Sequence, residues 1–111
     1  MKTNTTESKI LKGYRQYLKL EKAPSVNTIE AYLNDLSKLL SFLEKGGIPV
    51  LETQLEHLES FSASLHDIGI HPRSQARILS GIRSFYHFLV MENHLQADPS
   101  ELLESPNIGF H

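Results

Sequence analysis

The apolar residues of this chain recur at the three- and four-residue spacing of amphipathic helices, in four separate segments. The clearest segment is 71–94, where the apolar positions are Ile78, Leu79, Ile82, Phe85, Tyr86 and Leu89. Pro72 suits the first turn of this helix, because the N–H that proline lacks has no helical partner there. No segment shows the two-residue alternation of a strand.

The other three helices are predicted from the same pattern and from capping residues. The first runs to about Lys22, with Thr5 or Thr6 as its cap, and buries Ile10, Tyr14, Tyr17 and Leu18. The second begins at Ser25, or at the competing cap Asn27, ends at Gly46-Gly47, and buries Ile29, Tyr32, Leu33, Leu36, Leu39, Leu40 and Leu43. The third is capped by Thr53 and buries Leu55, Leu58, Leu65 and either Phe61 or Ser62.

The end of the chain carries the signature of one more short helix. Asp98 is suited to the N-cap, Pro99 to the first helical position and Glu101 to the capping partner, with Leu102 and Leu103 as the apolar side. Residues 105–109 have the character of a linker. The predicted fold is therefore all-α, with four main helices, a short C-terminal helix and no sheet.

Two of the predicted helices carry polar faces that lack carboxylates. At about 100° per residue, the face opposite Ile82 holds Arg73, Arg77, Ser80, Ser84 and His87. The face opposite Leu36 holds Asn27, Ala31, Asn34, Lys38 and Lys45, with Glu30 and Asp35 to its sides. Such faces suit a phosphate backbone and base edges. The alternative interpretation is that they are ordinary solvated helix faces.

The charge of the chain is unevenly distributed. The net charge is −2, yet residues 1–24 hold six Lys and Arg against two acidic residues, whereas residues 48–70 hold four acidic residues and no Lys or Arg. A domain with one basic and one acidic side is compatible with docking on DNA through one face, although many neutral proteins share this pattern. We expect the acidic third helix to face away from a polyanion.

The sequence contains no motif for catalysis or for binding a metal or cofactor. The chain has no cysteine, so neither disulfides nor a cysteine-based zinc site can form. The six histidines have no metal-ligand spacing, and no glycine-rich phosphate loop is present. The polar N-terminus does not resemble a signal peptide, and no apolar run approaches the ~20 residues of a membrane span. We therefore expect a cytoplasmic domain with no membrane partner, small-molecule substrate or cofactor.

Three segments together resemble a known family, the tyrosine recombinases of the Xer and phage-integrase branch. The run from Ser25 to Tyr32, followed by Asp35-Leu36 and Phe42-Leu43, is similar to the family pattern S-x-N-T-x-x-x-Y-x-x-D-L, followed in the next turns by F-L. The run from Arg73 to Leu89 is similar to the family segment R-x-L-S-x-L-R-x-F-Y-x-F-L. Asp98-Pro99, with the run from Leu102 to Pro106, resembles the exit helix and linker.

The resemblance implies a SAM-like orthogonal helical bundle that forms one half of a clamp on DNA. It implies a core-binding domain over residues 1–106 and a linker beginning at 107–111. In the family the second and fourth helices lie across the major groove, and the matching DNA-binding positions here are Asn27, Thr28, Ala31, Asn34, Lys38, Arg73, Ser74, Arg77, Ser80 and Ser84. Arg83 also matches, with a structural ion pair as the alternative role. The implied partners are duplex DNA and other recombinase protomers.

The family's catalytic residues have no match in this chain. The resemblance places an arginine-lysine-histidine set and a tyrosine nucleophile in a C-terminal domain after the linker. We therefore expect this chain to be a non-catalytic domain, truncated or isolated from an enzyme that breaks and rejoins DNA. Two rival interpretations stay open: a protein–protein interaction module, which an exposed apolar patch around Phe42, Phe88 and Val90 would favour, and a stand-alone helix-turn-helix regulator, which the turn at 68–72 would favour.

Overall fold

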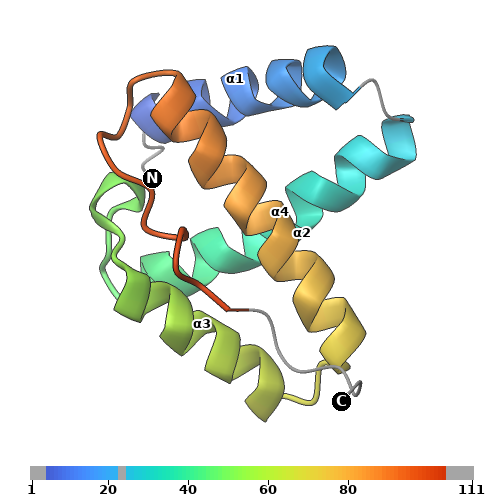
Figure 1. The fold of residues 1–111 in the computed structure, drawn as a ribbon, viewed down its shortest axis with the longest axis vertical. Helices are drawn as coiled ribbons and strands as arrows, with labels where there is room; N and C mark the ends of the chain where they lie inside the picture. Colours follow the sequence, from blue (N-terminus) through green and yellow to red (C-terminus); the bar gives the residue numbers. More distant parts are fainter. Residues whose placement is uncertain (1–4, 23–24, 105–111) are drawn as a thin grey trace.

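The computed structural model describes residues 5–22 and 25–104, and it consists of four α-helices joined by short connections (Figure 1). They are α1 (Thr5–Lys22), α2 (Val26–Lys45), α3 (Leu55–Asp67) and α4 (Pro72–Met91), with one 3₁₀ turn, η1 (Val50–Glu52), before α3. The described residues contain no strand. The predicted all-α fold and its four main helices are confirmed. None of the described helices is long and apolar enough to cross a membrane.

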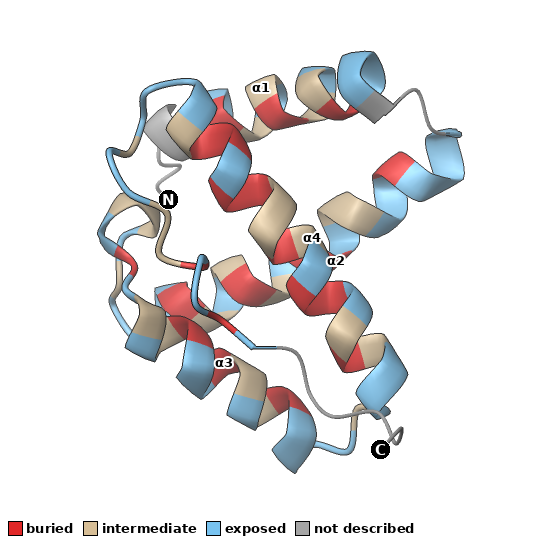
Figure 2. Cartoon of the chain, in the orientation of Figure 1, coloured by how far each residue is buried: buried red, intermediate tan, exposed pale blue. Residues whose placement is uncertain are grey.

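Helix α4 is the central element of the bundle. It crosses α2 in the middle of the molecule, and α1 and α3 lie on opposite sides of this crossing (Figure 1). Helix α4 contacts each of the other three helices. The predicted apolar stripe of α4 is buried along its whole length, as a helix with neighbours on several sides requires (Figure 2).

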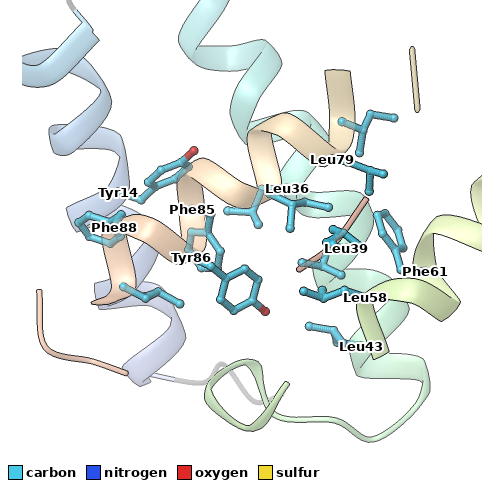
Figure 3. Packing of buried hydrophobic residues seen from close by; sticks show 14 of the residues in the cluster. Tyr14, Leu36, Leu39, Leu43, Leu58, Phe61, Leu79, Phe85, Tyr86 and Phe88 are labelled. Atoms are coloured by element: carbon cyan, nitrogen blue, oxygen red, sulfur yellow. The ribbon is translucent and has the colours of Figure 1, made fainter. Parts of the chain in front are cut away.

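The core is continuous from α1 to α3 and contains mainly leucine and aromatic side chains (Figure 3). At the α1 end, the Tyr14 ring packs edge-on against Phe85, with ring centroids 5.2 Å apart. At the α3 end, Phe61 is buried and packs against the half-buried Phe42. Of the two candidates for that position in α3, Phe61 and not Ser62 is therefore the core residue.

The ends of α2 match the prediction. The Ser25 hydroxyl caps the helix by accepting a hydrogen bond from the Thr28 backbone N–H at 3.2 Å, so Asn27 is not the cap. The helix ends at Gly46, and Gly47 adopts a φ of 70°, a left-handed conformation that is accessible to glycine without steric strain. In α4, Pro72 occupies the first helical position as predicted.

The predicted cap of α3 is wrong. Gln54 is the N-cap, and its backbone N–H donates to Nδ1 of His57 at 2.9 Å. Thr53 precedes the helix and is 5% exposed, and its hydroxyl donates to the Pro49 carbonyl at 3.3 Å. The prediction failed because η1 places Thr53 against the core, so that its side chain completes the 3₁₀ turn and not the helix. The capping prediction for Thr5 or Thr6 concerns side chains outside the described residues.

The segment after α4 folds back onto the bundle without forming the fifth helix. Residues 99–102 form turns, in which Oδ1 of Asp98 accepts hydrogen bonds from the backbone and hydroxyl of Ser100 at 2.8 and 2.6 Å. Leu103 is buried in the core, and its carbonyl accepts a hydrogen bond from Nη2 of Arg83 at 2.5 Å. Asp98 therefore caps a turn, and Arg83 contacts the returning chain. The expected linker, 105–109, and the boundary at 106–107 lie outside the described residues.

Candidate nucleic-acid interface

A groove of about 410 Å³ separates the first half of α2 from the middle of α4. Five of the ten predicted DNA-binding residues line it: Asn27, Thr28 and Ala31 from α2, with Arg77 and Ser80 from α4. All five are exposed. The crossing of α2 and α4 thus brings two polar faces, whose groove residues are 46 to 53 positions apart in sequence, to opposite walls of one groove.

A buried carboxylate joins the two walls. Asp35 is 3% exposed, and its Oδ2 lies 2.5 Å from Nη1 of Arg77. Its Oδ1 lies 3.7 Å from Nζ of Lys38, one turn further along α2. Burial raises the pKa of Asp35, and the two neighbouring cations oppose that rise in part. Asp35 therefore holds one cation from each helix at the groove.

The position of Asp35 corrects the expectation that it lies to the side of the α2 polar face. Asp35 also lines the groove, so the two predicted polar faces enclose a carboxylate. The interpretation from sequence missed this residue as part of the site. The three-residue spacing to Lys38 indicated only the pair within α2. The contact with Arg77 depends on the crossing of the two helices, which helical periodicity does not specify.

Ser84 lies at the interface of α4 with α1. It is half-buried, and its hydroxyl accepts a hydrogen bond from the buried Tyr14 hydroxyl at 3.2 Å. Burial raises the pKa of Tyr14 to about 12. Of the α4 positions that the sequence places on one polar face, Arg77 thus contacts α2 and Ser84 contacts α1.

The remaining predicted positions lie on the same two helices but do not line the groove. Asn34 and Arg73 are exposed, Ser74 is half-buried, and the Lys38 side chain is 38% exposed beside Asp35. The His71 imidazole accepts a hydrogen bond from the Arg73 backbone N–H at 3.0 Å, which caps the start of α4.

Helix α1 approaches the start of α2 through an exposed ion pair. Nη2 of Arg15 lies 2.9 Å from Oε2 of Glu30, and the two side chains are 42% and 54% exposed. Lys12 and Lys19 on α1 are also exposed. The ion pair neutralises part of the basic α1 surface, and Glu30 is not among the residues that line the groove.

The acidic helix α3 contributes no residue to the groove. It packs on the second half of α2 through Phe42 and Phe61, and on the first turn of α4 through a hydrogen bond of 2.8 Å from the Gln75 amide to the Ser62 hydroxyl. Glu56 and Glu59 are exposed on α3.

The apolar patch that would favour a protein-interaction module is not formed by the residues named for it. Phe88 is 3% exposed, and Phe42 and Val90 are partly buried. Within 5–22 and 25–104, no three His, Asp or Glu side chains gather in a group that could hold a metal ion. The groove between α2 and α4 is therefore the candidate functional site.

Residues 11–93 match the family model described as the phage integrase N-terminal SAM-like domain. The chain belongs to this family, and the resemblance noted in its sequence is confirmed.

Among curated proteins the chain is similar to tyrosine recombinases of the Xer type. Tyrosine recombinase XerC of Pseudomonas syringae pv. tomato is 39% identical over 97 residues, which cover 86% of this chain and 32% of that protein. Tyrosine recombinase XerD of Chlorobaculum tepidum is 37% identical over 101 residues, covering 91% of this chain and 33% of that protein. This chain thus spans about a third of the length of these relatives. No solved structure gives a significant match.

Proposed function

We propose that this chain is the DNA-binding N-terminal domain of a tyrosine site-specific recombinase and that it grips duplex DNA of a recombination half-site. The observation that carries the proposal is the α2–α4 groove, where polar residues from two helices stand beside two cations. Recombinase relatives of which this chain spans about a third support it. We propose that the whole protein cuts and rejoins DNA in the cytoplasm through a tyrosyl–phosphate link.

Each predicted DNA-binding residue, in the groove or beside it, has a role in this proposal. Arg77, Lys38 and Arg73 contact phosphates, which supplies the sequence-independent and salt-dependent part of the affinity. Asn27, Thr28, Asn34 and Ser80 hydrogen-bond to phosphates or base edges, and the Ala31 methyl group packs against an apolar edge such as a thymine methyl. Ser74 lies at the margin. Ser84 was also predicted to contact DNA, and we assign it instead to the contact with Tyr14.

The test compares the loss of one positive charge on α4 with the loss of one on α1. We expect Arg73→Ala to weaken binding to a short fluorescent duplex and to lower the slope of log K against log salt by about one, because a phosphate contact is lost. Lys12→Ala is the matched control, and it should leave the slope unchanged. Fluorescence anisotropy over a range of salt concentrations measures both.

The opposite result would favour a different surface. If Lys12→Ala changes the slope and Arg73→Ala does not, the DNA face lies on α1 and not on the polar face of α4. If neither chain variant nor the parent binds DNA at low salt, the protein-interaction alternative moves ahead. In that case the exposed Leu20 and Met91, which border a common hollow between α1 and α4, are the first positions to test for contacts with other protomers.

A further inference from the structure

The groove contains one charged side chain that sequence analysis did not assign to DNA binding. Asp35 is buried at the crossing of α2 and α4, beneath residues that are exposed. It is an acidic residue at a surface proposed to bind a polyanion, so its own charge opposes DNA. Its presence there calls for a role other than direct contact.

We propose that Asp35 is a positioning residue that fixes the Arg77 guanidinium in the orientation that meets DNA, with Lys38 as its weaker partner. This inference rests on the proposed function. The geometry supports it, because Asp35 Oδ2 contacts Nη1 of Arg77 at 2.5 Å, whereas Lys38 Nζ is 3.7 Å from Oδ1. The fixed end of the contact is the buried one, since the Asp35 side chain is 5% exposed and that of Arg77 is 56% exposed.

The contact leaves most of the guanidinium available. Arginine has five N–H donors in a planar fork, and Asp35 is contacted by one terminal nitrogen. The exposed remainder of the side chain can still donate to a phosphate or to a guanine edge. A long side chain that is already ordered loses less conformational freedom when it binds, so positioning strengthens binding without adding a contact.

The test separates positioning from charge by comparing two changes on the same helix. Asp35→Asn and Glu30→Gln each replace a carboxylate by its amide, and each removes one negative charge from α2 next to an arginine. Glu30 is the matched control, because its ion pair with Arg15 is exposed and lies outside the groove. Binding of the full chain to a short duplex of mixed sequence is measured by fluorescence anisotropy across a salt series.

We expect Asp35→Asn to weaken binding and Glu30→Gln not to weaken it. Glu30→Gln should leave affinity equal or slightly tighter, since it only adds net positive charge. Asp35→Asn should weaken binding about three- to tenfold at the same salt concentration, because an ordered arginine becomes free to rotate. In an Arg77→Met background, Asp35→Asn should no longer weaken binding. Thermal unfolding of each variant, followed by circular dichroism, verifies that the compared proteins are folded.

Three results would overturn the inference. If Asp35→Asn leaves the affinity equal or slightly tighter, as Glu30→Gln does, Asp35 does not position Arg77 and acts at most through its charge. If it tightens binding more, Asp35 competes with DNA for Arg77. If it still weakens binding in the Arg77→Met background, the effect does not pass through Arg77.

Failure of the inference is distinguishable from failure of the proposed function. If Arg77→Met weakens binding, but Asp35→Asn has the same effect with and without Arg77, the groove still binds DNA and only the positioning role is refuted. When Arg73→Ala and Arg77→Met both bind like the parent, the groove itself is misassigned. Arg77→Lys provides an independent variant should Asp35→Asn fail to fold. It keeps the charge but lacks the planar fork, so affinity should fall with an unchanged salt slope, and parent-like binding would refute the positioning role.

Discussion

Replacing Arg77 by methionine tests how the buried carboxylate at the α2–α4 crossing is stabilised. Methionine keeps an unbranched apolar stem but removes the group 2.5 Å from Asp35, leaving Lys38 at 3.7 Å as the remaining cation. Breaking a fully buried ion pair on one side costs about 3–5 kcal/mol. Because the Arg77 side chain is 56% exposed, solvent replaces part of the lost interaction, and we expect about 1–2 kcal/mol of destabilisation at pH 7.

The pH dependence of the stability loss shows whether it arises from the Asp35 carboxylate. Burial raises the folded-state pKa of Asp35 above its ordinary value, so ionisation of Asp35 disfavours the fold. The stability that protonated Asp35 gives the fold is fully present below the unfolded pKa of about 3.9, and it is lost as pH rises through the folded pKa. Removing Arg77 raises that folded pKa further. The stability gap between parent and Arg77→Met should therefore be small near pH 4 and should open as pH rises.

Urea unfolding of parent and variant at pH 4 and pH 7, followed by circular dichroism, measures this gap. The control is Arg77→Met in an Asp35→Asn background, where no carboxylate remains to be stabilised and the gap should not vary with pH. An equal loss of stability at both pH values would refute the electrostatic explanation and assign the effect to lost packing of the arginine stem.

Two buried tyrosines provide further predictions. The Tyr86 hydroxyl is buried near Thr53 and has no hydrogen bond of regular geometry among the described residues, so Tyr86→Phe should be neutral or stabilising by up to about 1 kcal/mol in urea unfolding. Tyr14→Phe loses the bond to Ser84 and should destabilise the fold by about 1 kcal/mol. The reverse order would contradict the assignment. Burial raises the pKa of both tyrosines to about 12, so their phenolate absorbance should appear near pH 12, and stability should fall as pH rises above about 10. Ionisation of all four tyrosines near pH 10 in the folded protein would show that neither is buried.

The helices could be predicted from sequence because their signals are local. The buried stripe around Ile82 requires only that apolar residues lie on one side of one helix. The Ser25 cap requires only that a hydroxyl accept a hydrogen bond from the backbone N–H three residues later. The polar faces of α2 and α4 were identified by the same reasoning. Five predicted residues line the groove because each helix has one buried stripe and the opposite face stays exposed.

The features that sequence did not predict all depend on contacts between elements. Ser84 shares a polar helix face with Arg77, but α1 lies close enough for Tyr14 to bond to it. The sequence of residues 99–102 is typical of a helix start. In the structure these residues form turns, and the Leu103 carbonyl accepts a hydrogen bond from Arg83. The predicted position of Asp35 is wrong for the same reason, because only the crossing of α2 and α4 brings Arg77 into contact with it.

At the α2–α4 crossing, the residues of the ion pair are adjacent in sequence to residues of the core. Asp35 precedes the buried Leu36, and Arg77 precedes the buried Ile78, so the ion pair lies at the edge of the core contact between the two helices. Any change that shifts the core contact also shifts the ion pair and the width of the groove. Asn27, Ala31 and Ser80 are exposed, and exposed positions tolerate substitution with little change in stability. The geometry of the groove therefore depends on the buried crossing, while the chemistry of its walls can change independently of the fold.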